Sequence, residues 1–144
     1  MTFKKITIIL CTYNEENYIK NSINLLQQNI EDLELIIVDD NSSDKTRDII
    51  NELNINKKIK LIHRKKSRGL ASAFLTGLIE SNGERIGWID TNMSELTLKF
   101  KEMNNALNEG HDIAFLSRYV EGGQDERKLF RSLCSKYFNT VCRL

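Results

Sequence analysis

The sequence predicts an α/β domain with a mostly parallel sheet and helices on both faces. Short apolar runs alternate with stretches of helical periodicity, an order that builds such sheets. Three of the runs, ITIIL, ELIIV and IAFL, are almost continuously apolar, as strands buried on both faces require. With 144 residues, of which 40% are hydrophobic and 28% charged, we expect a single domain over 1–144.

The first half of the chain contains three predicted strands, at 6–10, 33–38 and 59–63. Apolar residues at helical spacing predict a helix between the first two strands, with one face formed by Ile19, Ile23, Leu26 and Ile30. A second helix is predicted at 46–53. It follows four residues of the types that favour helix N-caps, Asn41, Ser42, Ser43 and Asp44.

The second half continues the alternation. Strands are predicted at 85–89 and 112–116. Leu70, Phe74 and Leu78 indicate a helix that ends at Gly83. Another helical face, with Gly110 as its stop, consists of Leu96, Phe100, Met103 and Leu107. The last predicted helix covers 126–143.

Polar side chains follow four of the predicted strands, at 12–16, 39–40, 90 and 117–118. If the strands are parallel, these groups meet at one edge of the sheet, where ligands of such sheets bind. Neighbouring carboxylates raise one another's pKa, so Asp40 and Asp90 need a counter-charge. A divalent cation would supply one and would recruit a phosphate-bearing ligand. Alternatively, Asp39 and Asp40 begin a turn and Asp44 caps a helix.

Composition and motifs exclude several classes of protein. A formal net charge of +1 gives no bulk attraction to nucleic acid. No apolar run reaches the roughly 20 residues that span a bilayer, and the start, MTFKKITIIL, is too short for a signal peptide. Three cysteines without metal-ligand spacing indicate free thiols in a reducing cytosol. Acids after the second and fourth strands do not fit a signalling receiver domain. No G-x-G-x-x-G follows the first strand, which disfavours a dinucleotide oxidoreductase.

Five motifs in order resemble those of family-2 glycosyltransferases. They are CTYNEEN (11–17), VDDNSSDKT (38–46), RGLASAFLTGL (68–78), WIDTNMS (88–94) and SRYVEGG (117–123). The likeness is greatest to dolichyl- and polyprenyl-phosphate mannose synthases, which implies a Rossmann-like GT-A fold. It further implies transfer, with inversion, of mannose or another hexose from a GDP- or UDP-linked donor to a polyprenyl or dolichyl phosphate, at the cytoplasmic face of a membrane. The alternative is a nucleotide-sugar-binding module without catalysis.

The resemblance also assigns site residues. It places Cys11, Tyr13, Glu15, Val38 and Asp40 at nucleotide-contacting positions. Its Asp-x-Asp motif falls on Asp90, Thr91 and Asn92, with Asp90 as the catalytic residue. The implied ligands of Mg²⁺ or Mn²⁺ are Asp90, Asn92 and Ser94, and Arg118 would contact the donor phosphates.

Each of these side chains also has a structural interpretation. Tyr13 would be an aromatic residue at a helix entry, and Glu15 an acid in a first helical turn. Arg118 would pair with Asp112 or Glu121 at the surface. The basic stretch HRKKSR (63–68) is either a phosphate-attracting rim or a solvated loop.

Two departures from the family pattern affect the site directly. Cys11 replaces a proline, which frees the backbone and predicts a less rigid nucleotide loop. Asn92 replaces the second acid, so the metal grip should be weaker. Asn92 and Glu95 also fit the spacing of a capping box, in which Asn92 would serve the helix instead.

Two further departures concern the surroundings of the site. The segment ELTLK (95–99) stands where relatives have a His/Pro-rich stretch, so the geometry of the metal loop is expected to differ. The sequence ends at Leu144, so we expect the acceptor-binding part of the family to be missing. The basic amphipathic pattern at 126–143 either packs on the sheet or lies on an anionic membrane surface.

Overall fold

The computed structural model describes residues 5–54, 58–66 and 69–117, and it divides into two units, Met1–Glu102 and Met103–Leu144. The first unit contains a four-stranded parallel sheet in the order β3-β2-β1-β4. Its strands are β1 (Ile6–Thr12), β2 (Leu33–Asp39), β3 (Ile59–His63) and β4 (Arg85–Trp88). The predicted α/β class and the parallel sheet are confirmed.

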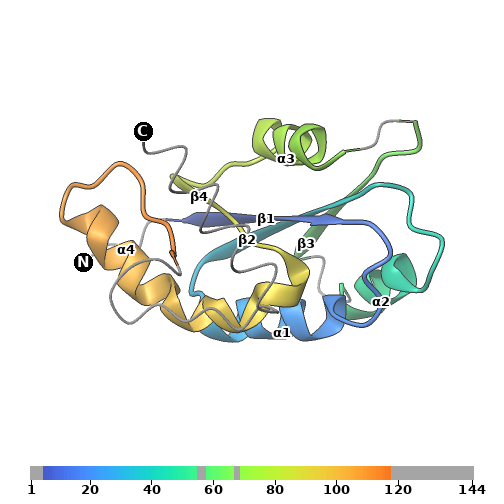
Figure 1. The fold of residues 1–144 in the computed structure, drawn as a ribbon, viewed down its shortest axis with the longest axis horizontal. Coiled ribbons are helices and arrows are strands. Elements are labelled where there is room, and N and C mark those ends of the chain that lie inside the picture. Colours follow the sequence, from blue (N-terminus) through green and yellow to red (C-terminus); the bar gives the residue numbers. More distant parts are fainter. Residues whose placement is uncertain (1–4, 55–57, 67–68, 118–144) are drawn as a thin grey trace, which may run out of the picture. The chain divides into compact units, whose positions relative to one another are not determined.

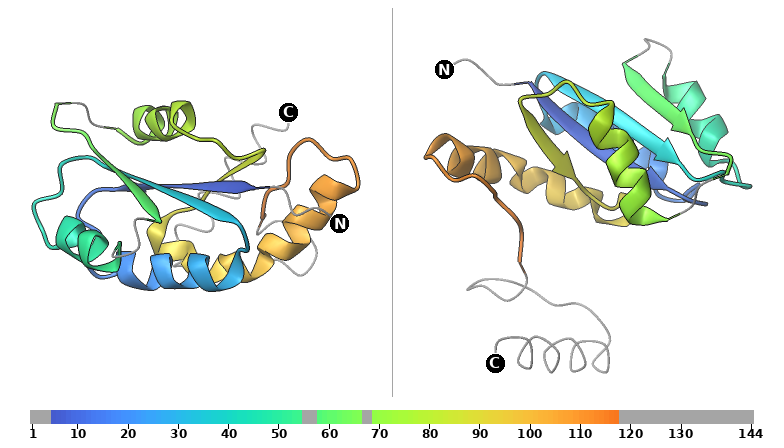
Figure 2. Two further views of the ribbon diagram at one scale, coloured as in Figure 1. Left: turned by 180° about the vertical axis from the view of Figure 1, so that it is seen from behind. Right: turned by 90° about the horizontal axis from the view of Figure 1, so that it is seen from above.

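The helices of the first unit cover both faces of the sheet (Figure 1). The helical elements are α1 (Ile19–Asn29), α2 (Thr46–Leu53), α3 (Leu70–Ile79), the 3-10 segment η1 (Thr91–Lys99) and the start of α4 (Phe100–Asn108). Seen from above in Figure 2, α3 runs over the strands, whereas α1 and α2 lie beneath them. The predicted helices at 19–30 and 46–53 are confirmed.

The two faces follow from the alternation of side chains along each strand. On one face, Ile8 and Leu10 of β1 and Ile37 of β2 pack with α1 and α2 in the larger buried cluster. On the other, Ile9 and Val38 pack with Ala73 of α3 in a smaller one. Continuous apolar runs are therefore needed in β1 and β2, because both of their faces are buried.

Close approach of α3 to the sheet depends on Gly77. A Cβ at this position would lie 2.6 Å from Cγ2 of Ile9 and 3.3 Å from Cγ2 of Val38, so no larger residue fits without displacement. The helix ends at Ile79, not at Gly83 as the sequence suggested. Gly83 instead lies in the turn before β4, where its N–H donates to Oγ1 of Thr7 at 2.8 Å.

The described part of the second unit, 103–117, contains the rest of α4 and an irregular segment. Gly110 follows α4 with a φ of +101°, as its prediction as a stop requires. The predicted strand at 112–116 is wrong: the segment is irregular, and Ile113 and Phe115 are 78% and 79% exposed. An apolar pattern supplies only a tendency, because a strand also needs a neighbour that completes its hydrogen-bond ladder.

Two sequence expectations remain outside this description. The helix at 126–143 and the motif at 117–123, beyond Ser117, lie outside the described residues. Among the helices that the structure describes, none combines the length and the apolar character needed to cross a membrane.

Candidate functional site

A pocket of about 300 Å³ opens at the carboxyl edge of the sheet in the first unit. It is lined by Cys11, Thr12, Tyr13, Glu15, Asp40, Gly69, Leu70, Ala73 and Asp90. Five of the residues predicted for the site from the sequence are thus brought together, namely Cys11, Tyr13, Glu15, Asp40 and Asp90.

The strand order explains why the pocket forms here. β1 lies between β2 and β4. From β1 the chain first adds β2 and β3 on one side, and only after α3 does it add β4 on the other side of β1. Adjacent loops diverge at such a point and leave a crevice beyond the carboxyl ends of the strands. Asp40 directly follows β2, Asp90 follows β4 by one residue, and the start of α3 completes the wall.

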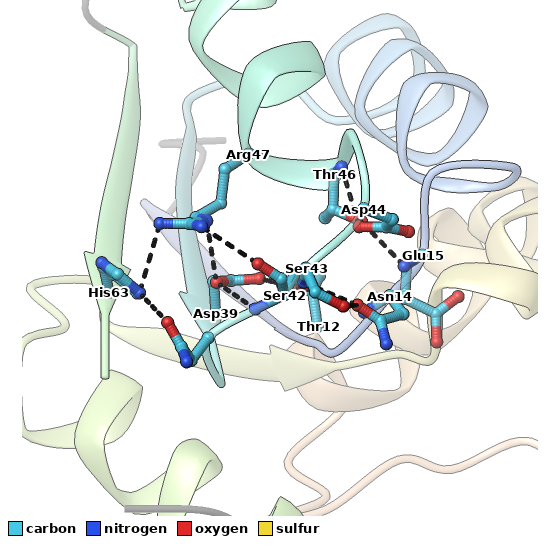
Figure 3. Close-up of polar contacts among 11 residues, drawn as sticks. Thr12, Asn14, Glu15, Asp39, Ser42, Ser43, Asp44, Thr46, Arg47 and His63 are labelled. Atoms are coloured by element: carbon cyan, nitrogen blue, oxygen red, sulfur yellow. Dashed lines mark hydrogen bonds and ion pairs between the residues drawn. The ribbon is translucent and has the colours of Figure 1, made fainter. Parts of the chain in front are cut away.

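A network of hydrogen bonds fixes the loop after β1 to the loop after β2 (Figure 3). The backbone N–H groups of Asn14, Glu15 and Glu16 donate to Oγ of Ser42 (2.9 Å), Oγ1 of Thr46 (2.8 Å) and Oδ2 of Asp44 (3.1 Å). In return, Ser43 N–H donates to Oδ1 of Asn14 at 2.9 Å and Lys45 N–H to Oε2 of Glu16 at 3.1 Å. We call this network the loop clamp.

The loop clamp bears on three sequence expectations. Asp44 accepts from the N–H of Thr46 at 3.0 Å, so it satisfies the start of α2 as a cap would, and it also binds the other loop. Burial opposes ionisation of Asp44, but hydrogen bonds from Thr46 and Glu16 outweigh it and lower its pKa.

Glu15 is not in a first helical turn, since α1 begins at Ile19. Cys11 lies inside β1 opposite Val38, and the loop that follows is held by the clamp.

Asp39 is completely buried, and it lies beside Ser42 of the clamp (Figure 3). Its carboxylate accepts from Oγ1 of Thr12 at 3.2 Å and from both the hydroxyl and the N–H of Ser42, the latter at 3.0 Å. Nε of Arg47 lies 3.7 Å from Oδ2. The acid therefore joins β1, β2 and α2 and does not face the pocket.

Asp40 lines the pocket and is paired with Arg64, which the sequence did not single out. Nε of Arg64 donates to Oδ1 at 2.6 Å and an Nη donates to Oδ2 at 2.8 Å. The N–H of Gly69 also donates to Oδ2, at 2.9 Å. Hydrogen bonding with Asp40 raises the pKa of the Arg64 guanidinium. The sequence signal was the basic stretch HRKKSR, whose first arginine is largely buried and serves as the counter-ion of Asp40.

Cys11 lies between the two acids of the pocket. Burial and the charges of Asp40 and Asp90 together raise the pKa of its thiol to about 11, against the opposing effect of Arg64. The thiol is therefore protonated at neutral pH. It is a neutral wall of the pocket and is not poised to act as a nucleophile.

The segment from Asp90 onward differs from the expected capping arrangement. The 3-10 segment η1 already begins at Thr91. Asp90 precedes it with extended backbone angles, and its side chain makes no capping hydrogen bond. Asn92 thus lies inside the 3-10 segment and cannot be its N-cap, so the capping-box interpretation is wrong. Asp90 and Asn92 are both exposed. The carbonyl of buried Thr91 accepts from Oγ of Ser22 at 2.7 Å, which ties η1 to α1.

Three of the described residues predicted for the site, Val38, Thr91 and Asn92, do not line the pocket. The side chain of Val38 is fully buried against α3, so it belongs to the core. Thr91 serves the contact with α1. Arg118 and the side chain of Ser94 lie outside the described residues. In contrast, Gly69, Leu70 and Ala73 line the pocket although no site role was assigned to them, and they belong to the motif RGLASAFLTGL.

The described residues supply only part of the coordination shell of a divalent cation. They contain no group of three or more His, Cys, Asp or Glu side chains close enough to form a metal site by themselves. Mg²⁺ and Mn²⁺ in nucleotide sites usually take one or two protein carboxylates, with phosphates and water completing the shell. Exposed Asp90 in the pocket wall, with Asn92 two residues on, fits that reduced requirement.

Comparisons with known proteins agree with this fold. The model of the family "Glycosyl transferase family 2" matches residues 7–141. Dolichol-phosphate mannosyltransferase of Pyrococcus furiosus is 33% identical over 135 residues, which are 92% of this chain and 38% of that protein. Polyprenol monophosphomannose synthase of Mycolicibacterium smegmatis is 29% identical over 144 residues, 94% of this chain and 54% of that protein.

A solved structure is similar as well. The mannosyltransferase PcManGT of Pyrobaculum calidifontis, in complex with GDP-Man and Mn²⁺, is 26% identical with a TM-score of 0.56, over 62% of this chain and 28% of that one. This chain spans only about 38% to 54% of the two curated relatives. Its parallel sheet, the motifs along it and the match over 7–141 together show that the chain belongs to glycosyltransferase family 2, with a GT-A-like fold.

Proposed function

We propose that this chain binds the donor of a glycosyl transfer reaction, in which a hexose moves from a nucleoside diphosphate to a polyprenyl or dolichyl phosphate. One observation carries the proposal: Tyr13, Glu15, Asp40 and Asp90, which come from three separate loops, line one pocket at the carboxyl edge of the sheet. The names of the two relatives, a dolichol-phosphate and a polyprenol-phosphate mannose enzyme, support the class of acceptor and make mannose the first sugar to test.

The pocket divides into two parts with different chemistry. Tyr13, Glu15 and Asp40 offer an aromatic ring and two carboxylates, which suit a base and the hydroxyl groups of a ribose. Asp90 lies at the end of β4 and would face the diphosphate. A bound Mg²⁺ or Mn²⁺, held by Asp90 and more weakly by Asn92, with Ser94 as a further candidate ligand, would neutralise the charge of the leaving diphosphate. Arg118 remains the candidate for a direct phosphate contact.

The transfer itself asks little acid–base chemistry of the protein. An oxygen of the acceptor phosphate attacks the anomeric carbon while the bond from that carbon to the nucleoside diphosphate breaks, so the configuration is inverted. The acceptor phosphate is already an anion and needs no general base. The residues of this chain would therefore act by holding the donor in line and by stabilising charge on the leaving group. Because the acceptor is a membrane lipid, we place the reaction at a membrane surface, on its cytoplasmic side.

Donor turnover tests the proposal. The 144-residue chain is incubated with GDP-mannose, and separately with UDP-glucose, in the presence of a polyprenyl phosphate and either Mn²⁺ or EDTA. Formation of a glycosyl polyprenyl phosphate that depends on Mn²⁺ and is abolished by Asp90→Ala would support it. Absence of transfer by this chain and by a longer protein that contains it would reject the transferase function.

A second function, nucleotide-sugar binding without transfer, is favoured by Asn92. This exposed amide stands where the family pattern has an acid, and it brings no charge to a metal. Calorimetry with GDP and UDP, each with and without Mn²⁺, separates the two functions. Binding that does not respond to Mn²⁺ favours the binding module, and absence of binding rejects both.

A further inference from the structure

We propose that Arg64 is a positioning residue of the donor pocket: it orients Asp40 and neutralises it, so that Asp40 recognises the nucleoside while Asp90 alone serves the metal-bound diphosphate. This inference rests on the proposed function, since it assigns separate tasks to two acids of the same pocket. It starts from one geometric observation, the two-point pairing of Arg64 with Asp40.

The pairing fixes both the position and the plane of the carboxylate. The two bonds, 2.6 Å and 2.8 Å long, join the two oxygens of Asp40 to two nitrogens of one planar guanidinium. Such a fork-to-fork pair is more directional than a contact with a lysine, whose ammonium is a point charge. The side chains of Arg64 and Asp40 are only 9% and 10% exposed, so the surrounding protein restricts both.

Arg64 also contacts the start of α3, which forms part of the pocket wall. Its Nη groups donate to the carbonyl of Gly69 at 3.2 Å and to Oγ of Ser72 at 3.0 Å. Gly69 precedes α3 with a φ of +119°, a conformation that favours glycine, and its N–H donates back to Asp40. A single arginine thus connects Asp40 with the start of α3, which contributes Gly69, Leu70 and Ala73 to the pocket.

The charges of the two pocket acids differ in a corresponding way. Asp40 has a counter-ion within the protein, so its charge is balanced without any cation from solution. For Asp90, no ion pair with another described residue is present. A divalent cation would therefore be attracted to Asp90 and would gain little from Asp40. Loss of Arg64 should weaken recognition of the nucleoside, with or without phosphates, and should leave the response to Mn²⁺ unchanged.

The test measures dissociation constants of guanosine, uridine, GDP and UDP, the two diphosphates with and without Mn²⁺, for the full 144-residue chain. Arg64→Met should raise the dissociation constants of the preferred nucleoside and of its diphosphate by the same factor, about tenfold. This factor corresponds to the loss of one strong charge-assisted contact. The ratio of the diphosphate affinities with and without Mn²⁺ should stay as in the wild type. Arg64→Lys retains the charge but not the two-point geometry of the guanidinium, and it should raise both dissociation constants by about threefold.

Two controls separate positioning from a merely structural role. Lys60→Met removes a cation from β3 whose partner, Glu80, is outside the pocket, and it should change no affinity. The double variant Arg64→Met with Asp40→Asn removes both charges, so its melting temperature should recover relative to Arg64→Met. Its nucleoside affinity should equal that of Asp40→Asn alone, because Arg64 acts through Asp40. A further loss of affinity from Arg64→Met in the Asp40→Asn background would show that Arg64 supports the fold and does not act by positioning Asp40.

Three other outcomes would reject the role of Arg64 or the proposed function. If Arg64→Met weakens diphosphates but not nucleosides, Arg64 is a phosphate contact and the proposal is wrong. Unchanged affinities would reject it as well. If the wild-type chain binds none of the four compounds, the proposed function is wrong, and the role of Arg64 is wrong with it. If the wild type binds them and Arg64→Met binds them equally well, only this inference is rejected.

Discussion

Asp39 and Asp40 are adjacent in the chain, but their carboxylates lie toward opposite faces of the sheet and each meets a different arginine. Asp39 is buried beside Arg47 of α2, and Asp40 lines the pocket beside Arg64 and the start of α3. Successive side chains of a strand point to opposite sides, so two neighbouring acids acquire unlike tasks. The first fastens the loops beneath the site, and the second belongs to the site itself.

Replacement of Asp90 by Asn should uncouple nucleotide binding from metal. The variant retains the size of the side chain but removes the carboxylate that would hold the cation. We expect the affinity for GDP or UDP in Mn²⁺ to fall by about tenfold or more, to the value measured in EDTA. Calorimetry checks this, with Asp48→Asn as the matched control, since Asp48 is an exposed acid of α2 outside the pocket. An equal Mn²⁺ response in Asp90→Asn and wild type would contradict the assigned role.

Replacement of Asn92 by Asp should have the opposite effect. Asn92 is exposed in η1, so a carboxylate at this position costs little in burial, and it adds a charged oxygen ligand two residues from Asp90. We expect Mn²⁺ to tighten nucleoside diphosphate binding by about tenfold more than in the wild type. Titration of Mn²⁺ at fixed GDP and fixed UDP measures the change. A variant with no stronger metal response would mean that position 92 does not face the cation.

Asn14 should matter both for its conformation and for the loop clamp. Its φ of +58° is unusual for a residue with a side chain, and its Oδ1 accepts from Ser43. Asn14→Gly keeps the conformation and loses the bond, and should cost about 1 kcal/mol of unfolding free energy. Asn14→Ala loses both, and should cost about 2 kcal/mol. Urea unfolding measures these values.

Asp32 provides the comparison for Asn14. It also has a positive φ, of +50°, but lies in the turn before β2, at the other end of the sheet. Asp32→Ala should destabilise the fold by about 1 kcal/mol without changing the affinity for nucleotides. Asn14→Ala should weaken that affinity as well, because the pocket loop is no longer held. Equal nucleotide affinities in the two alanine variants would contradict a role of the clamp in binding.

Glu34 should make the stability of the fold depend on pH in the acid range. Burial opposes its ionisation, but hydrogen bonds from Thr7 and Asn82 and the charge of Lys5 lower its pKa from 4.5 to about 2. Because the folded-state pKa is the lower one, the stabilisation is complete above about pH 4.5 and disappears as the pH falls toward 2. Its full size is about 3 kcal/mol at most.

Thermal unfolding of Glu34→Gln between pH 7 and pH 2 checks this expectation. The difference in melting temperature from the wild type should be large at pH 7 and should shrink as the pH approaches 2. Glu31→Gln, at an exposed neighbouring position, should have a small effect throughout. A difference for Glu34→Gln that stays constant with pH would show that its carboxylate is not the titrating group.

The sheet and the meeting of Asp40 with Asp90 could be predicted because they depend on local patterns. Apolar runs specify buried strands, and parallel strands bring the residues that follow them to one edge. The roles of Arg64 and Val38 could not be predicted in this way. Which of several basic residues in HRKKSR pairs with an acid depends on the path of the loop, and whether position 38 points to the core or to the pocket depends on the register of β2.

The error at 112–116 has a different origin. IAFL has the composition of a buried strand, but burial and pairing are provided by other parts of the chain and cannot be read from the segment. The capping-box prediction at Asn92 failed because η1 already begins at Thr91, one residue before the amide. In both cases the pattern was present, and the surrounding structure decided against it.

The loop clamp grips Asn14, Glu15 and Glu16 largely through their main-chain amides, and its hydroxyl and carboxylate acceptors belong to the neighbouring loop. Exchange of the side chain at position 15 would leave the grip on that amide in place. In the proposed donor site, a change of the side chain at position 15 could therefore alter the preference for the base while the backbone of the loop stays in place.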